Sequence, residues 1–319
     1  MHGREFFMRW IIRGWPGPSA DGLGPRLALN TARPSTDPRL ARNSALPPAR
    51  ALLDHRQASF ALRLLARPEN SGGQEEILRY RNSDLMARIR RICGLGRGET
   101  AEVQIWEEFR EMRASVIVEE KEEALRTAKE WTDQENSIWT DGSRLENGAV
   151  GAAVAFKEEG VWKGKGFYLG KNKEVFDAET YAIYQAMRTL DDRGDRGRRY
   201  TFSNSQAAVS RIQHDRTGPG QALAILAIEA AEAITGRDNS ITIRWTPSHA
   251  RVEGNELADD MARRSAEERE ERAPPAYLRE ASLSHLTRTA TEARSAATAE
   301  WIRVHSGHRR RYNPQWGGR

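Results

Sequence analysis

Hydrophobic and polar residues alternate with a period of two in the middle of the chain, and this pattern predicts β-strands. Three such runs lie at 137–140, 149–156 and 162–168, with turn signals at Asn147-Gly148 and Glu159-Gly160 between them. This spacing is typical of an antiparallel meander. A helical pattern over 178–190 follows, then a strand at 199–203, two helices within 205–235, a strand at 241–247 and a helix beginning near Asn255. The order predicts an α/β domain at 135–270, built on a mixed five-stranded sheet with helices on both faces.

The flanks of this domain have different patterns. Residues 14–50 are rich in Pro, Gly, Ser and Arg without a sustained apolar period, so we expect 1–47 to be a disordered or linker arm. Residues 48–134 are expected to form a mainly helical connecting segment, with helices at 48–67, 83–94 and 116–131. Residues 271–319 are predicted to be a basic polar tail, because two prolines stop the last domain helix and an arginine run follows at 309–311.

Composition narrows the class of partner and the compartment. The chain has 319 residues, of which 38% are hydrophobic and 30% charged, with a formal net charge of +5. A basic balance favours a polyanionic partner such as nucleic acid. The single cysteine, Cys93, excludes an intramolecular disulfide and fits a reducing intracellular setting, in the nucleus or the cytoplasm, although a lone cysteine is most often a small buried apolar residue. No run approaches the roughly 20 apolar residues needed to cross a bilayer, so we expect no membrane association.

The first candidate for chemistry is Asp141, in the run Ile-Trp-Thr-Asp-Gly-Ser at 138–143. Strand alternation places Trp139 and Asp141 on one face, and the glycine that follows is expected to end the strand. The carboxylate is then at the carboxyl end of a strand, where open α/β sheets bind ligands. An Asp-Gly-Ser sequence is also common in ordinary turns, so this motif alone does not establish a site.

A second acid, Glu179, extends the apolar stripe of its own predicted helix. The stripe consists of positions at helical spacing: Glu179, Ala182, Ile183, Ala186 and Leu190. An acid on a core-facing stripe must be paired, protonated or bound to a metal, because burying an isolated charge costs several kcal/mol. The alternative is a first-turn glutamate that is stabilised by the helix dipole. The position on the stripe favours a functional role.

Three further polar residues follow strands or begin helices. Asn204 lies where the strand at 199–203 ends, although asparagine is also common as a helix cap. His249 lies on a loop after the strand at 241–247, and Asp259 lies beside the apolar stripe of the last domain helix. A lone histidine is usually structural, and a lone acid in a first helical turn usually stabilises the helix. The combination of all five residues is therefore more informative than any one of them.

In this combination the chain resembles the ribonuclease H type 1 domain, and most closely the version in fungal non-LTR retrotransposon polyproteins. The match covers about 135–270, and its most specific part is the run Gly-Asn-Glu-Leu-Ala-Asp at 254–259 after Ser248-His249. Residues 48–131 and the tail after Ala281 resemble the regions on either side of ribonuclease H in those elements. The resemblance thus implies a ribonuclease H-like fold and a reverse transcriptase module in a parent polyprotein.

The resemblance also implies a site. Asp141, Glu179 and Asp259 match metal-binding carboxylates, Asn204 stands at the position of a further one, and His249 matches a loop histidine that assists proton transfer or product release. The implied cofactors are two Mg²⁺ (or Mn²⁺) ions, held by several hard anionic oxygens, and no small-molecule cofactor. The implied substrate is an RNA-DNA hybrid or other nucleic acid, whose 2′-hydroxyls are recognised near the Asp-Gly-Ser turn. The implied nucleic-acid contacts are Gly142, Ser143, Ser205 and Asn255.

Two departures from the family pattern shape the expectations. Asn204 stands where the family has an aspartate, so the site is one negative charge short and both metal affinity and turnover should fall. Arg251 stands where a glycine is usual, which is expected to stiffen or displace the histidine loop. Three hypotheses follow: a metal-dependent endonuclease that cuts the RNA strand of hybrids, a catalytically inactive module that binds nucleic acid, and a decayed retroelement fragment.

Overall fold

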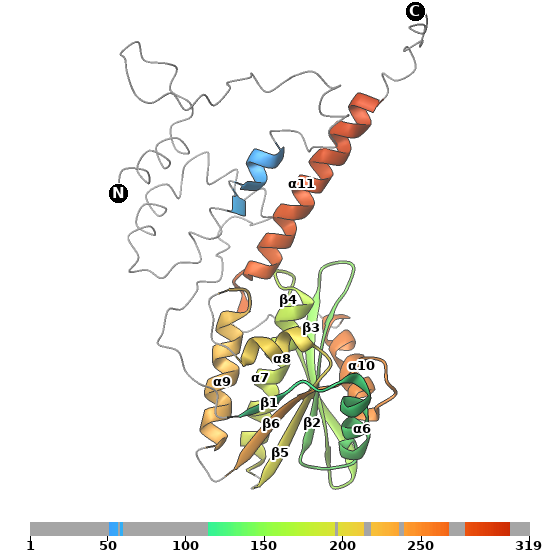
Figure 1. Ribbon diagram of the computed structural model, residues 1–319, viewed down its shortest axis with the longest axis vertical. Coiled ribbons are helices and arrows are strands. Elements are labelled where there is room, and N and C mark those ends of the chain that lie inside the picture. Colours follow the sequence, from blue (N-terminus) through green and yellow to red (C-terminus); the bar gives the residue numbers. More distant parts are fainter. Residues whose placement is uncertain are drawn as a thin grey trace, which may run out of the picture.

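The computed structural model describes residues 51–56, 58–59, 114–194, 197–213, 218–235, 239–267 and 278–306. Within them a six-stranded sheet has the order β1-β6-β5-β2-β3-β4 (Figure 1). Its strands are β1 (Ser115–Ile117), β2 (Ser137–Arg144), β3 (Val150–Glu158), β4 (Val161–Gly170), β5 (Arg198–Ser203) and β6 (Ser240–Trp245). Strands β2, β3 and β4 pair antiparallel, whereas β5 is parallel to β2, β6 to β5 and β1 to β6. The predicted mixed sheet with its antiparallel meander is confirmed.

The prediction of five strands was one short. The additional strand, β1, pairs with β6 from Ser115 against Thr242 to Ile117 against Arg244. An ion pair of 2.8 Å between Arg244 Nη1 and Glu119 Oε2 reinforces this edge. The strand lies at the start of the stretch predicted as a helix over 116–131, of which only α6 (Lys121–Trp131) is helical. Three residues are too few to show a period, and their partner strand is distant in the sequence.

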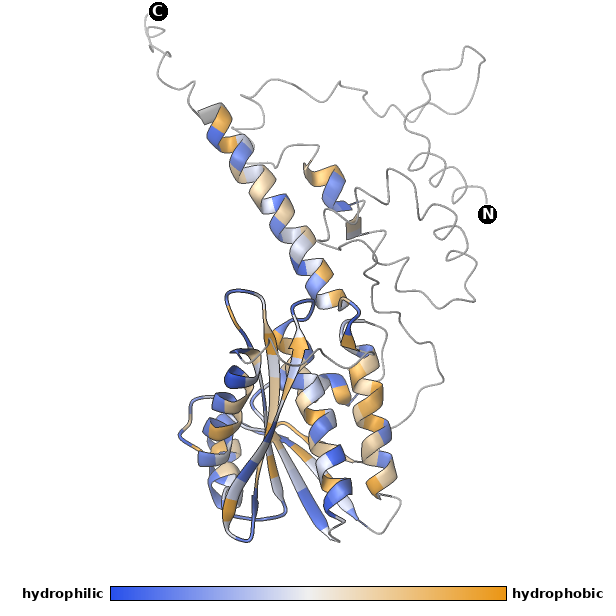
Figure 2. Ribbon diagram, turned by 180° about the vertical axis from the view of Figure 1, so that it is seen from behind, coloured by the Kyte–Doolittle hydropathy of each residue, from blue (hydrophilic) through white to orange (hydrophobic). Residues whose placement is uncertain are grey.

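Helices cover both faces of the sheet, as predicted. One face carries α7 (Val175–Arg193), α8 (Gln206–Ile212) and α9 (Gln221–Thr235), and the other carries α6 and α10 (Glu253–Glu267) (Figure 1). Strand alternation divides the core accordingly, because Ile138 packs with residues of α7 and α9 whereas Trp139 packs with Ala128 of α6 and Ala258 of α10. Figure 2 shows that α9 is apolar over most of its length, and this helix packs against α7 as well as β6.

Glycines in β3 and β4 bring α10 unusually close to the sheet. A Cβ added to Gly151 would overlap the carbonyl oxygen of Ala262 and would lie 2.6 Å from the backbone nitrogen of Ala266. Gly164 and Gly166 of β4 face α10 in the same way, against the side chains of Met261 and Ser265. The absence of side chains at these glycines therefore sets the distance between α10 and the sheet, and with it the position of every residue on α10.

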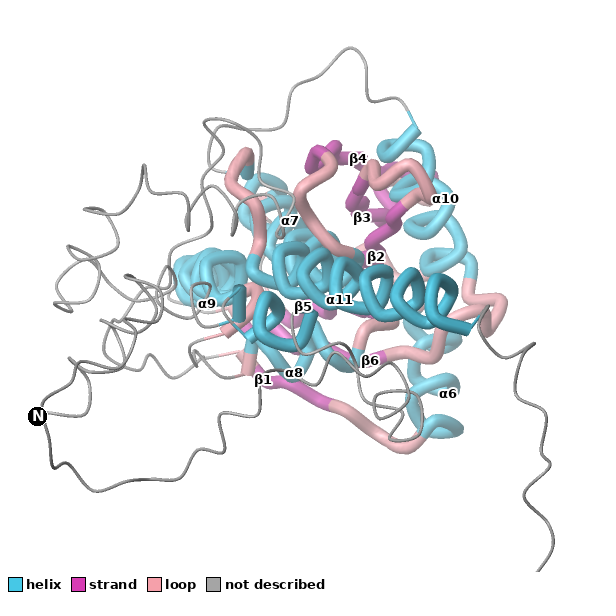
Figure 3. The backbone as a smooth tube through the Cα atoms, turned by 90° about the horizontal axis from the view of Figure 1, so that it is seen from above, coloured by secondary structure: helices cyan, strands magenta, loops and turns pink. Residues whose placement is uncertain are grey.

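A long helix occupies the segment predicted as a basic polar tail. Helix α11 (Leu283–Ser306) begins beside the domain and extends away from it, crossing over its top in the view of Figure 3. Leu286 and Ala290 on this helix are fully buried or nearly so. Helical residues 51–56 and 58–59 lie beside it, with His55 Nδ1 3.4 Å from the carbonyl oxygen of Ala290. This finding confirms part of the helix predicted at 48–67.

Several expectations fall outside the described residues. These are the arm at 1–47, the helix at 83–94, Cys93 and the arginine run at 309–311. The domain bounds 48–134, 135–270 and 271–319 stay predictions. Among the described helices, none has the length and apolar character that a membrane crossing requires.

Candidate active site

Asp141 lies inside β2, opposite Ala153 of β3, and is 4% exposed. The sequence placed it at the carboxyl end of its strand, but β2 continues to Arg144. It is instead β5 that ends here, because the last pairing between the two strands joins Thr140 to Ser203. Asp141 is thus the first residue of β2 without a neighbour on β5 and lies beside the point where β5 ends. The predicted strand-end location is correct for the sheet, although not for the strand.

Glu179 reaches the same region from the first turns of α7. The capping box formed by Glu174 and Asp177 starts this helix, and Ala182, Ile183, Ala186 and Leu190 are buried, as the predicted stripe requires. The backbone of Glu179 packs directly on Gly142, where an added Cβ would lie 2.6 Å from the Glu179 nitrogen. The start of α7 therefore packs closely against the residue that follows Asp141. Glu179 itself is partly exposed and accepts a hydrogen bond from Ser205.

Asn204 joins β5 to α8 and contacts Asp141 directly. Its Nδ2 donates to Asp141 Oδ2 at 3.0 Å, and its backbone carbonyl accepts from Trp245 Nε1 at 3.0 Å. Its Oδ1 is buried and has no hydrogen-bond partner among the described residues. The asparagine is thus a member of the site and not the helix cap, since the N-cap of α8 is Ser205.

The third acid, Asp259, comes from the opposite face of the sheet on α10. It is partly exposed, follows the buried Ala258, and acts on Asp141 through its charge. The next residue, Asp260, faces Arg263 and Arg264 on the helix surface instead. The close approach of α10 over Gly151 therefore places one of two adjacent aspartates in the site.

His249 is on the loop between β6 and α10. It is exposed and has φ +53°, and Arg251 two residues later has φ +56°. Both residues are in the left-handed region, which glycine adopts at much lower cost than other residues. Within the described part of the chain, no hydrogen bond joins His249 to the three acids. Arg251 thus adopts a backbone conformation that favours glycine, at the position where the sequence resemblance led us to expect one.

The four predicted nucleic-acid contacts divide into two pairs. Gly142 and Ser143 are partly exposed beside Asp141. Ser205 is 8% exposed, and its hydroxyl accepts from the Ala208 nitrogen at 3.2 Å and bonds to Glu179. Asn255 is 4% exposed, with its Oδ1 unpartnered among the described residues. Sequence reasoning missed that Ser205 orients Glu179; its only signal was a serine directly after a strand and before a helix.

Burial disfavours the ionised form of both Asp141 and Glu179, and neighbouring negative charges add to this effect at Asp141. Burial, together with the charges of Asp259 and Glu179, raises the pKa of Asp141 to about 7, against opposing hydrogen bonds from Gly142 N and Asn204. Burial likewise raises the pKa of Glu179, against the hydrogen bond from Ser205. Acids that resist ionisation in this way favour a proton or a cation in the site.

The donor set suits a hard divalent cation. Carboxylate and amide oxygens are the ligands that Mg²⁺ prefers, and the unpartnered Oδ1 of Asn204 is an acceptor that a cation would satisfy. As they stand, however, no three Asp, Glu, His or Cys side chains in the described ranges are close enough together to hold a metal ion. The chemistry of the donors therefore fits a metal, while their spacing would have to contract around it.

The topology is that of a ribonuclease H-like α/β fold: a three-stranded meander, two parallel strands beside its first strand, and helices on both faces. A crystal structure of RNase H1 from the halophilic archaeon Halobacterium salinarum NRC-1 is similar, with 21% identity over 41% of this chain and 97% of that one and a TM-score of 0.34. LC11-RNase H1 in complex with an RNA/DNA hybrid is also similar, with 21% identity over 41% and 96% of the two chains and a TM-score of 0.35. No family model matches the chain, and no curated protein matches it.

Proposed function

We propose that this chain binds RNA-DNA hybrids and hydrolyses the RNA strand endonucleolytically, with the help of divalent cations. The observation that carries the proposal is that the buried Asp141 accepts a hydrogen bond from the Asn204 amide and is repelled by the charges of Glu179 and Asp259, so that residues of four separate elements act on one another. Neither packing nor helix capping requires this arrangement, and uncompensated carboxylates oppose folding. Acids gathered where a central strand of a sheet ends are instead typical of a site for a cation and a phosphate ester.

The residues would divide the work as follows. Asp141, Glu179 and Asp259, with the Oδ1 of Asn204, would hold Mg²⁺ or Mn²⁺, in the family two ions. A bound cation supplies an activated water and charge stabilisation for the leaving oxygen. The partly exposed Gly142 and Ser143 would contact the RNA strand beside Asp141. His249, exposed on its loop, would donate a proton to the leaving oxygen through its imidazole.

A second candidate is a module that binds hybrids without cutting them. The observation in its favour is the hydrogen bond from Asn204 Nδ2 to Asp141 Oδ2, since an N–H donor occupies a lone pair that a cation would otherwise use. Under this candidate Asn204 removes chemistry while the architecture for binding remains. The two candidates agree on the partner and differ only on cleavage.

One set of variants tests both candidates. The purified chain should release fragments from a labelled hybrid in Mg²⁺ or Mn²⁺, and Glu179→Gln should abolish the release, whereas Glu232→Gln on α9 should not change it. Asn204→Asp should raise the cleavage rate by about tenfold or more, since it restores an anionic ligand, while the hybrid dissociation constant stays within about twofold. If the wild type binds without cutting and only Asn204→Asp cuts, the second candidate is correct. If neither protein binds or cuts hybrids, only a decayed fragment remains.

We also propose a parent polyprotein and a cellular location for the chain. The resemblance of its flanks supports an origin in a polyprotein with a reverse transcriptase module, in an intracellular compartment. Co-purification of the chain with such a module expressed separately would test this partnership.

A further inference from the structure

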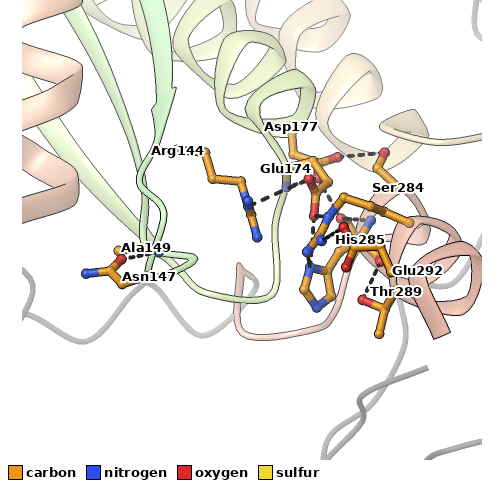
Figure 4. A network of polar contacts seen from close by, with 11 residues as sticks. Arg144, Asn147, Ala149, Glu174, Asp177, Ser284, His285, Thr289 and Glu292 are labelled. Atoms are coloured by element: carbon orange, nitrogen blue, oxygen red, sulfur yellow. Dashed lines mark hydrogen bonds and ion pairs between the residues drawn. The ribbon is translucent and has the colours of Figure 1, made fainter. Parts of the chain in front are cut away.

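The start of α11 is fastened to the start of α7 by a polar network (Figure 4). Ser282 N donates to the carbonyl of Asn172 at 3.0 Å, and Lys173 Nζ donates to the carbonyl of Glu280 at 2.7 Å. Lys173 is 4% exposed, so this contact is shielded from water. The segment just before α7 and the segment just before α11 are thus joined by one backbone hydrogen bond and one bond from the Lys173 side chain.

Glu174, the N-cap of α7, is held by side chains of α11. Its Oε1 accepts from Arg288 Nε at 2.7 Å and lies 3.0 Å from His285 Nδ1. Its Oε2 faces Arg144 Nε of β2 at 3.6 Å, and Figure 4 shows Arg144 and His285 on different sides of Glu174. One carboxylate therefore links the sheet, α7 and α11.

Asp177, in the first turn of α7, is fully buried between two helix starts. It accepts from Glu174 N at 2.7 Å, from Ser282 Oγ at 2.5 Å and from Ser284 Oγ at 3.3 Å. The amino ends of α7 and α11 meet at this carboxylate, and the partial positive charge of both ends favours an acid there. The first turn of α7 cannot shift without breaking these bonds.

Glu179 directly follows that first turn. Glu179 lies only five positions after Glu174, which corresponds to about 7.5 Å of helix. The Glu179 backbone rests on Gly142, so a movement of the turn would alter the spacing between Glu179 and Asp141. Misplacement of a reacting group by about 1 Å can cost about a hundredfold in rate.

We infer that Ser282, Ser284, His285 and Arg288 act as a clamp that positions Glu179 for hydrolysis, from a segment outside the ribonuclease H-like sheet and its helices. These are positioning residues, because they act through α7. The inference rests on the proposed function, and the clamp makes hydrolysis depend on α11. No feature of the sequence resemblance assigns such a role to the tail.

Amide hydrogen exchange and kinetics on the full chain test the inference. In Ser282→Ala/Arg288→Ala, exchange of the amides of 177–179 should accelerate by about tenfold or more, while that of 183–190 stays within about twofold. With hybrid substrate, kcat should fall by about tenfold with KM nearly unchanged, and Arg288→Lys alone should retain most of the activity. The matched pair Ser295→Ala/Arg303→Ala, on the exposed turns of α11, should change neither measurement.

The outcomes separate the clamp from the proposed function. Unchanged exchange at 177–179 overturns the clamp, and so does a local acceleration with an unchanged kcat. If amide exchange in the double variant accelerates equally along the whole of α7, the single variant Arg288→Ala is measured instead. An equal acceleration along α7 in that single variant also overturns the clamp. If the wild type cleaves no hybrid, the proposed function fails, and the exchange measurement alone decides whether the clamp holds the turn.

Discussion

At the scale of single residues, Asp141 is in the least favourable electrostatic position of the site. It is 4% exposed, and two further acids, Asp259 and Glu179, repel its negative charge. Its hydrogen bonds from Gly142 and Asn204 offset only part of this cost, since its pKa stays near 7. A residue that opposes folding and is nevertheless buried is better explained by function than by stability.

Asp141→Asn should therefore stabilise the fold in a pH-dependent way. The unfolded carboxyl loses its proton near pH 4, whereas the folded one loses it at about 7. Between these values the folded state binds more protons, so the free energy of unfolding of the wild type falls as pH rises through this window. Without divalent cations, the variant should gain more stability at pH 8 than at pH 5, by about 2–3 kcal/mol, because the Asn204 amide can turn its unpartnered Oδ1 toward the new donor.

Urea unfolding at pH 5 and pH 8 in a chelator measures this difference. Asp192→Asn serves as the control, since Asp192 is exposed and lies 3.8 Å from Lys165 on the surface. A variant that is equally stable or less stable than the wild type at pH 8 would show that Asp141 is not electrostatically strained.

The positions of the acids could be predicted from the sequence, but the hydrogen bonds that hold their side chains could not. The positions of Glu179 and Asp259 near the core were predictable because Glu179 lies on an apolar stripe and Asp259 beside one, and Asn204 follows a strand. The bonds from Ser205 to Glu179 and from Asn204 to Asp141 join residues 26 and 63 positions apart. No local pattern encodes such contacts, since they arise only when the sheet is assembled.

At the scale of elements, the position of α10 depends on the glycines of β3 and β4, which present no side chain to it. Gly151 meets backbone atoms of Ala262 and Ala266, which cannot yield, whereas Gly166 meets the side chain of Ser265, which can rotate. Helix α10 is therefore fixed by a contact between main chains. Its distance from β2 determines how near Asp259 comes to Asp141.

Gly151→Ala should be much more harmful than Gly166→Ala. The added methyl must push α10 away from the sheet, at a cost of about 3 kcal/mol or more, whereas rotation of Ser265 should limit the cost at Gly166 to about 1 kcal/mol. Thermal unfolding of both variants measures the difference. Equal losses of stability would mean that the backbone of α10 adapts more easily than this packing indicates.

The two elements that sequence reasoning missed share a physical cause. Strand β1 has three residues and depends on β6, and α11 was predicted to be part of a tail because the chain turns polar and basic around two prolines at 274–275. Both are stabilised by partners that are distant in the sequence. The strands β2 to β6, by contrast, were predictable because turns and alternation are local signals.

At the scale of the whole molecule, the folding unit is larger than the stretch that resembles a family. Leu278 packs in a cluster with Ala178 and Tyr181 of α7, and Leu283 and Leu286 on α11 are also buried. On the other side, α6 contributes Ala128 to the cluster around Trp139. A fragment limited to 135–270 would expose these surfaces, the β6 edge and the buried acid Asp177 together.

We therefore expect the fragment 114–306 to unfold cooperatively and the fragment 135–270 to lack a stable fold. Loss of the burial of three leucines alone amounts to about 5–9 kcal/mol, which is comparable with the whole stability of a typical domain. Urea unfolding followed by circular dichroism, with binding of a hydrophobic dye, distinguishes the two fragments, since a partly collapsed core binds the dye and loses its sharp transition. If 135–270 unfolds as cooperatively and at the same urea concentration as 114–306, then β1, α6 and α11 are not required for a stable fold.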